Sequence, residues 1–461
     1  RTSRTRREGD SRIAETSRDD RDGSDVRPHD GDRAEDIFVF DKHGNVDHMQ
    51  LQNLAAFKMA IEEARVNSTQ FPDLNINYAV YSGISYSGSA NTAIKIINDP
   101  LNIKAVVTAL PFVETSTMHK IFDDNDVIMA HSVASEAEFG DAVLYRNRIQ
   151  VNPIDSFQGM VIQDLLCNHY NITRVMIFAS NDDFGTRITL ELSDSTFCPI
   201  NVLATVIVPD YQTSFSKEIR RAMNSEAYAL LFFTGRQVAA RLIEQGAREG
   251  LFREGVQLMG HEKLMDPSVF NYFTDSSIDV AKAMHGFIGL KYWPDYSLQY
   301  TSYGQAFASR LRSAFSSALP CSTVDANGKQ YLYLDQDPSK ACAVLSIGAN
   351  EALEAHVALT YDATTLLLRS LQRMAKAQLT INGTNLHFDV VRNQAFLGAS
   401  GLVDIYEGVA SKGYYGEGSR EEGIVYKLMN FNADNYRQSP SSAFVQVGVW
   451  DRQKNNLRCE A

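Results

Sequence analysis

Residues 175–185 read Val-Met-Ile-Phe-Ala-Ser-Asn-Asp-Asp-Phe-Gly, an apolar run that ends in an acidic turn with a glycine. The run at 175–178 is apolar without alternation, which predicts a strand that is buried on both faces. Such strands are typical of parallel sheets that helices cover on both sides. The stretch therefore predicts an α/β fold.

Apolar runs of the same kind recur at 37–40, 105–107, 202–208, 229–233 and 256–259. Between the runs, apolar residues lie three or four positions apart, for example in 54–64 and 238–246, as on the buried face of a helix. This alternation continues to about residue 285, which is too long for one sheet of usual width. We therefore predict two doubly wound lobes, each built on a parallel sheet.

The pattern differs at the two ends of the chain. Residues 1–35 alternate in charge sign and have few apolar residues, which predicts a disordered tail. After residue 295 the sequence predicts helices at 302–316 and 351–376 and a β-rich end at 395–450. Asp155, followed by Gln158 and then by apolar residues, predicts a capping box at the start of a further helix.

Composition excludes several classes of partner. The 461 residues carry a formal net charge of −12, which argues against a nucleic-acid backbone or an anionic membrane as partner because both require a basic face. No apolar run approaches the roughly 20 residues that a membrane span needs. The chain starts at Arg1 without a signal-peptide pattern, so we expect a piece of a longer protein.

The five cysteines and three sequons give limited information. Cys321 and Cys342 flank a polar stretch and are candidates for a disulfide, although two unrelated buried thiols are the alternative. The sequence leaves open whether Cys167, Cys198 and Cys459 are paired. Asn67, Asn171 and Asn382 begin N-x-S/T sequons and are glycosylation candidates, although about as many arise by chance.

Enzyme motifs are incomplete or absent. The sequence has no P-loop and no G-x-S-x-G elbow, and His261-Glu262 lacks the second histidine of a zinc protease motif. The acidic pairs at 123–124 and 182–183 fit solvated loop charges better than catalytic carboxylates. We expect no catalytic residue, no metal and no cofactor.

Six segments, in order, resemble one known family. They are the helix at 54–64, the segments 145–148 and 153–155 taken together, the turn 182–185, Tyr361-Asp362-Ala363, the segment 396–403 and the strand 444–450. In this order they are similar to the type I periplasmic-binding-protein fold in its receptor version. That version forms the ectodomains of class C G-protein-coupled receptors and of natriuretic-peptide-type receptor guanylate cyclases.

The resemblance implies an organisation of the whole chain. Lobe 1 would comprise 36–155 and 292–397, lobe 2 would comprise 156–291 and 398–452, and a three-strand hinge would join them, with 453–461 as a linker. It also implies a bridged excursion at Cys321 and Cys342, and hence an oxidising compartment. A homodimer on the extracellular or lumenal face of a membrane is implied too, with membrane contact only through a segment outside this chain.

Parallel sheets bind ligands beyond the carboxyl ends of their strands, so candidate site residues follow the predicted strands. In lobe 1 these are Thr115, Ser116, Ser132 and Ser135, whose hydroxyls suit a carboxylate, with helix capping as the alternative role. In lobe 2 they are Asp183, Phe184, Thr234 and Glu262, where an acid and an aromatic face suit an amine, with lobe packing as the alternative for Phe184.

The chain departs from amino-acid-binding members of the family after the third strand. Phe112 and Glu114 stand where those members have small hydroxyl residues, so the carboxylate site is in question and the sequence does not identify the ligand. We expect a receptor ectodomain that closes on a small molecule, with a transporter's solute-binding protein and an α/β enzyme as alternatives. An apolar span encoded after Cys459 would favour the receptor.

Overall fold

The computed structural model describes residues 48–67, 69–72, 74–81, 86–141, 143–193, 198–209, 211–292, 302–314, 322–324, 330–332, 353–354, 356–392, 395–405, 418–422, 424–451 and 456–459. Three predictions lie outside these ranges. They are the tail at 1–35, the strand at 37–40 and the pairing of Cys321 with Cys342.

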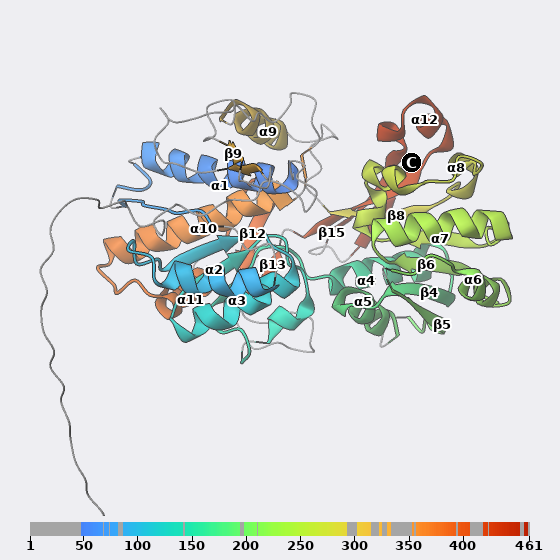
Figure 1. The fold of residues 1–461 in the computed structure, drawn as a ribbon, viewed down its shortest axis with the longest axis horizontal. Coiled ribbons are helices and arrows are strands. Elements are labelled where there is room, and N and C mark those ends of the chain that lie inside the picture. Colours follow the sequence, from blue (N-terminus) through green and yellow to red (C-terminus); the bar gives the residue numbers. More distant parts are fainter. Residues whose placement is uncertain are drawn as a thin grey trace, which may run out of the picture.

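The helices form two groups, which we call lobe 1 and lobe 2 (Figure 1). Lobe 1 contains α1 (His48–Val66), α2 (Tyr86–Ile97), α3 (Phe112–Asp124), α10 (His356–Lys376) and α11 (Gly383–Arg392). Lobe 2 contains α4 (Ser156–Asp164), α5 (Asp183–Ser193), α6 (Ser216–Met223), α7 (Arg236–Glu249), α8 (Val280–Ala283) and α12 (Ala433–Gln438). Helix α9 (Ser302–Ala314) packs on α1.

The sheet of lobe 1 is parallel and covered on both faces. Its described strands are β1 (Ala105–Thr108), β2 (Ile128–His131) and β3 (Arg148–Gln150), in the order β1-β2-β3. Met129 clusters with Ile96 of α2 and Phe122 of α3 on one face. Ile128, on the other face, clusters with Leu359 of α10. Side chains of one strand thus alternate between two helix layers, as a doubly wound lobe requires.

Lobe 2 has an eight-stranded sheet in the order β16-β15-β14-β8-β7-β6-β4-β5. Its strands are β4 (Arg174–Ser180), β5 (Asn201–Val208), β6 (Ala229–Phe233), β7 (Gln257–Gly260), β8 (Ile288–Tyr292), β14 (Val425–Phe431), β15 (Phe444–Asp451) and β16 (Asn456–Cys459). The first five are parallel, and β14 joins β8 in antiparallel register. The C-terminal part of the chain therefore completes this sheet.

The predicted strand at 175–178 is confirmed as part of β4. Val175 and Ile177 cluster with apolar residues of α4 and α5, whereas Met176 and Phe178 cluster with those of α6 and α7. The fold is thus the predicted α/β arrangement. Two small antiparallel units add to it, β9 (Ser322–Val324) with β10 (Gln330–Leu332), and β11 (Phe396–Gly398) with β12 (Gly401–Ile405) and β13 (Arg420–Glu422).

Two local predictions were wrong. The run at 202–208 is not buried on both faces, because β5 is an edge strand and Ile207 is 45% exposed. Asp155 precedes α4 as predicted, but its side chain does not cap the helix. Asp155 has helical backbone angles, which do not suit an N-cap residue. Its Oδ1 instead accepts a hydrogen bond of 3.2 Å from the side-chain amide of Gln158.

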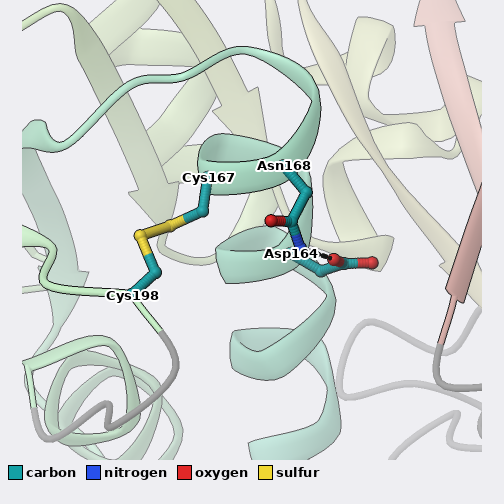
Figure 2. Close-up of a disulfide and its surroundings, with 4 residues drawn as sticks. All are labelled: Asp164, Cys167, Asn168 and Cys198. Atoms are coloured by element: carbon teal, nitrogen blue, oxygen red, sulfur yellow. Dashed lines mark hydrogen bonds between the residues drawn. A yellow bond between two sulfur atoms is a disulfide. The ribbon is translucent and has the colours of Figure 1, made fainter.

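The structure pairs two cysteines that the sequence left open. Cys167 lies in η2 (Leu165–His169), a π-helical turn that follows α4, and its sulfur is bonded to that of Cys198 (Figure 2). The Cα atoms are 6.3 Å apart, within the usual range for a disulfide. The bond ties the end of α4 to the segment that leads into β5. On the same turn, the Asn168 amide donates to Asp164 Oδ1, pointing away from the disulfide.

Candidate functional site

Ser132 lies in a buried hydrogen-bond chain at the carboxyl edge of the lobe 1 sheet. It follows β2, and its Oγ donates to the carbonyl oxygen of Thr108 at 3.2 Å. Ser132 Oγ also lies 2.8 Å from Thr360 Oγ1, and Thr360 Oγ1 in turn contacts Asn53 Oδ1 at 2.9 Å. The chain joins β1, β2, α10 and α1, so it fixes the geometry of this edge.

The hydroxyls of Thr115 and Ser116 are bonded to the backbone around the start of α3. Thr115 Oγ1 donates to the carbonyl oxygen of Leu110 at 3.0 Å, and Ser116 Oγ donates to that of Val113 at 3.1 Å. Both hydroxyls therefore bond within lobe 1, but they do not cap the helix as the alternative prediction had it, since the N-cap of α3 is Pro111. Glu114 adds a negative charge to the first turn of α3, where a carboxylate would be repelled.

Ser135 belongs to a polar connection between the lobes. Its backbone N–H donates to Glu136 Oε2 at 2.9 Å, and its carbonyl oxygen accepts from the Asp155 N–H at 2.9 Å. From Asp155 the connection continues to Gln158, whose Oε1 accepts a 3.3 Å hydrogen bond from the backbone N–H of Glu262 in lobe 2. Ser135 and Glu262, predicted separately, thus lie at opposite ends of one hydrogen-bonded chain.

Carboxyl groups are concentrated at this connection. Burial, followed by the charges of Glu136 and Glu262, raises the pKa of Asp155 well above its usual value, while Lys263 acts in the opposite direction. Burial also raises the pKa of Glu262, opposed by Lys263 and Arg236. Asp155 and Glu262 therefore hold their protons to higher pH than free carboxyl groups do.

Phe184 packs at the carboxyl edge of the lobe 2 sheet. Only 8% of it is exposed, and its ring centroid lies 4.6 Å from that of His261. The ammonium of Lys263 lies over the ring, with Nζ 5.4 Å from the centroid. A ligand amine that used this aromatic face would have to compete with Lys263. Asp183 is the first residue of α5, and its side chain is not among those described.

The turn before α5 explains why the sequence needs Asp182 and Gly185 there. Asp182 Oδ1 accepts a hydrogen bond of 2.9 Å from the Gly185 N–H, so this carboxylate satisfies a free donor of the first helical turn. A Cβ on Gly185 would lie 2.5 Å from the Ser180 carbonyl oxygen. The aspartate-aromatic-glycine turn is thus a close approach of backbone that also positions Phe184.

Thr234 and His261 directly follow β6 and β7. Thr234 is 1% exposed, and its carbonyl oxygen lies 2.8 Å from His261 Nε2. Burial, then the charge of Lys263, lowers the pKa of His261 to about 3, so the ring is neutral at physiological pH. Thr234 Oγ1 is buried and has no hydrogen-bond partner among the described residues.

Two cations that sequence reasoning did not select lie between these groups. Arg236 Nε donates to the carbonyl oxygen of Lys263 at 2.9 Å, which joins the start of α7 to the 3₁₀ turn η3 (Glu262–Met265). The pKa of His356, a lobe 1 residue, is lowered to about 4. Burial is the largest cause, and the charges of Lys263 and Arg236 lower it further. Their charges therefore act across the two lobes. The available signal was position, because Lys263 directly follows Glu262 and Arg236 lies two residues after Thr234.

The hydrogen-bonded chain from Ser135 to Glu262 therefore links the carboxyl edges of the two sheets. Of the predicted residues, Ser132, Ser135, Phe184, Thr234 and Glu262 lie at these edges, while the hydroxyls of Thr115 and Ser116 bond within lobe 1.

A family model described as the receptor family ligand binding region matches residues 52–413. The chain belongs to this family.

Solved structures of the same fold agree with this membership. This receptor-family chain is similar to a leucine binding protein, LivK, from Thermotoga maritima MSB8, with a TM-score of 0.59 and 14% identity over 87% of this chain and 95% of that one. It is also similar to LivJ from Streptococcus pneumoniae str. Canada MDR_19A, a branched-chain amino acid transporter substrate binding protein in complex with isoleucine, with a TM-score of 0.57 and 13% identity over 83% and 91%. No curated protein matches the sequence significantly.

A cavity of about 440 Å³ lies inside lobe 1 of this receptor-family chain rather than between the lobes. It runs along β1 and is bounded mainly by apolar residues of α1, α10 and the segment 76–81, with Asn53 and Thr360 among its polar residues. It contains no residue of lobe 2, but it reaches the carboxyl edge of the lobe 1 sheet, where Thr108 and Thr360 are hydrogen-bonded to Ser132.

Other features of the described residues bear on the remaining predictions. Asn67 and Asn171 are exposed, whereas Asn382 is partly buried and its Oδ1 accepts a hydrogen bond from the Asn385 N–H. Within the described part of the chain, no three His, Cys, Asp or Glu side chains gather closely enough to hold a metal ion. None of the described helices has the length and apolarity that a membrane crossing demands.

Proposed function

We propose that this chain binds a small molecule between its lobes and transmits binding by lobe closure, as the extracytoplasmic ectodomain of a membrane receptor. The observation that carries the proposal is the hydrogen-bonded chain from Ser135 through Asp155 and Gln158 to the Glu262 backbone, which links the carboxyl edges of two parallel sheets. Ligands of open α/β sheets bind at such edges. Family membership supports the same location.

The proposed site has one wall from each lobe. Lobe 1 contributes Ser132 and Ser135, and lobe 2 contributes Phe184, Thr234 and Glu262. A ligand that contacts both walls stabilises the closed state by the difference between its affinities for the closed and the open forms. Closure is therefore the output that a downstream segment would detect.

The proposed lobe boundaries follow from this hinge. Lobe 1 comprises 36–155 and 292–397, and lobe 2 comprises 156–291 and 398–452. The antiparallel pairing of β14 with β8 supports the assignment of the C-terminal strands to lobe 2. The three chain crossings, near Asp155, Tyr292 and Leu397, would then act as hinge strands.

A thermal-shift screen with amino acids, small acids and polyamines tests ligand binding directly. A specific small molecule at 100 times its Kd should add about 2.7 kcal/mol to the free energy of unfolding. The same molecule should reduce the radius of gyration measured by small-angle X-ray scattering, because closure compacts the two lobes. Stabilisation without compaction would contradict signalling by closure, and no stabilisation by any compound would contradict binding.

A transporter's solute-binding protein is the second candidate function. The similarity of the chain to LivK and LivJ, which are binding proteins, favours it. The coding sequence beyond residue 461 separates the two, since a receptor requires a membrane-spanning segment followed by a signalling domain. A catalytic role, the third reading, predicts turnover that Glu262→Gln abolishes, whereas a binding module would lose affinity alone.

A homodimer through lobe 1 is part of the receptor proposal. Ile94 on α2 and Val113 on α3 leave 47% and 52% of their surfaces exposed, and these two helices pack side by side. Apolar residues at such positions suit a protein interface. Sedimentation analysis of the wild type and of Val113→Asp tests this, because the charge should shift a dimer to monomer.

A further inference from the structure

Helix α7 begins with donors that have no side-chain partner. Its 14 residues start at Arg236 after the N-cap Gly235, which has no side chain to cap the helix. The first-turn N–H groups therefore retain their capacity to bind an acceptor, and the helix dipole adds partial positive charge at this end. No acidic residue stands in the first turn.

The residue before this N-cap provides a second, independent observation. Thr234 is 1% exposed, and its hydroxyl has no hydrogen-bond partner among the described residues. A buried hydroxyl without a hydrogen-bond partner raises the free energy of the folded chain. A ligand that supplied an acceptor for this hydroxyl would remove that cost. Thr234 directly precedes Gly235, which places it at the same end of α7 as the free N–H groups.

Two cations stand beside the same helix end. Arg236 is 30% exposed, and its nearest carboxylate, that of Asp266, lies 4.0 Å away. Lys263 is exposed, and among the described side chains its ammonium contacts the Phe184 ring and no carboxylate. The Arg236–Lys263 hydrogen bond keeps the two residues together. Together they provide charge that an incoming anion can neutralise.

The corresponding helix start in lobe 1 has the opposite character. At α3 the first turn carries Glu114, and the hydroxyls of Thr115 and Ser116 are bonded to backbone carbonyls. Free donors and positive charge are therefore found at α7 and not at α3. This difference favours the opposite polarity to the sequence prediction, which had a carboxylate in lobe 1 and an amine in lobe 2.

We propose that the N-terminus of α7, with Thr234, Arg236 and Lys263, binds a carboxylate of the ligand on the lobe 2 wall. The inference rests on the proposed function, since it identifies the chemical class of the molecule held between the lobes. The carboxylate accepts from the α7 backbone and Thr234 while Arg236 and Lys263 balance its charge. Binding would draw Lys263 away from the Phe184 ring.

The test uses the whole chain and a panel of related probes. Thermal shift and calorimetry compare L-leucine, 4-methylpentanoate (which lacks the amine) and 3-methylbutylamine (which lacks the carboxylate), together with glutarate. At least one carboxylate should stabilise the chain, and the amine should not. Arg236→Gln and Lys263→Gln should each weaken carboxylate binding about tenfold or more. Arg241→Gln, on the same helix but outside its first turn, is the matched control and should bind normally.

Thr234→Val separates binding from a structural role. Because the hydroxyl has no partner, this nearly isosteric change should leave the melting temperature of the free chain unchanged or higher, yet weaken carboxylate binding. Stabilisation by the amine alone, or carboxylate binding that survives all three substitutions, would overturn the inference and leave the proposed function standing. A panel in which no compound binds would count against both.

Discussion

The buried carboxylate of Asp362 accepts a 2.7 Å hydrogen bond from the backbone N–H of Ser400. Asp362 lies in α10 of lobe 1, and Ser400 lies in the turn between β11 and β12, where the chain leaves that lobe. The same carboxylate accepts from the Ala399 N–H at 2.6 Å, and Arg420 donates to Ser400 Oγ at 2.7 Å. One side chain therefore holds a proposed hinge strand against lobe 1.

Asp362→Asn should lower the free energy of unfolding by about 2–4 kcal/mol, because an amide nitrogen replaces one of two accepting oxygens in a buried site. Urea denaturation followed by circular dichroism measures the loss. Asp124→Asn, an exposed position on α3, is the matched control and should change stability by about 0.5 kcal/mol at most. Equal effects of the two substitutions would show that the Asp362 contacts contribute nothing.

Gly185→Ala should lower the free energy of unfolding by about 3 kcal/mol, because the added Cβ would meet backbone atoms of Ser180 that cannot move freely. Gly250→Ala is the comparison. Gly250 has φ +80° and open space around a Cβ, so only backbone strain of about 1 kcal/mol is expected. Thermal denaturation of both variants gives the order, and a larger loss at Gly250 would contradict the close approach at Gly185.

Replacing both Cys167 and Cys198 with Ser should cost about 3–4 kcal/mol, because the bond closes a loop with a sequence separation of 31 residues. Peptide mapping under non-reducing conditions should recover the Cys167–Cys198 pair. The same map tests the predicted Cys321–Cys342 pair. Free thiols at both Cys167 and Cys198 in the oxidised chain would contradict the pairing.

The sequence predicted what depends on local pattern. Apolar runs located β4, β6 and β7, and the three-to-four spacing of apolar residues located the buried face of α7, since burial determines both patterns. It did not predict that β5 is an edge strand, because position within a sheet depends on the other strands. Nor did it predict the partner of Cys167, since cysteine pairing is set by the tertiary fold.

The candidate site was predicted less completely for the same reason. Their positions after predicted strands selected Thr234 and Glu262, and both lie at the carboxyl edge of the lobe 2 sheet. The roles of hydroxyls at Thr115 and Ser116 depend on whether a backbone carbonyl lies within reach, and both bond locally. Lys263 and Arg236 were not selected because their effect on His356 arises only when the two lobes are together.

The histidines make the fold sensitive to acid. Burial is the main cause that lowers the pKa of His261 to about 3 and those of His356 and His387 to about 4, and the pKa of His131 is also well below its usual value. In the unfolded chain these rings bind protons near pH 6.5. Between about pH 4 and pH 6.5 the unfolded state therefore binds more protons, so stability should fall as the pH falls.

Asp362 opposes this trend. Burial raises its pKa to about 6, so the folded state binds the extra proton between about pH 4 and pH 6 and this group favours folding at the acidic end. Asp155 and Glu262, whose pKa values burial also raises, act in the same direction as Asp362. The four histidines outnumber these three carboxyl groups, and each separation of one pH unit between folded and unfolded pKa is worth about 1.4 kcal/mol, so the net effect of acid is a loss of stability. Urea denaturation at pH 7.0, 5.5 and 4.5 should show progressive loss of several kcal/mol. His387→Gln should reduce the slope, and a stability that rises on acidification would contradict the neutral buried state of these rings.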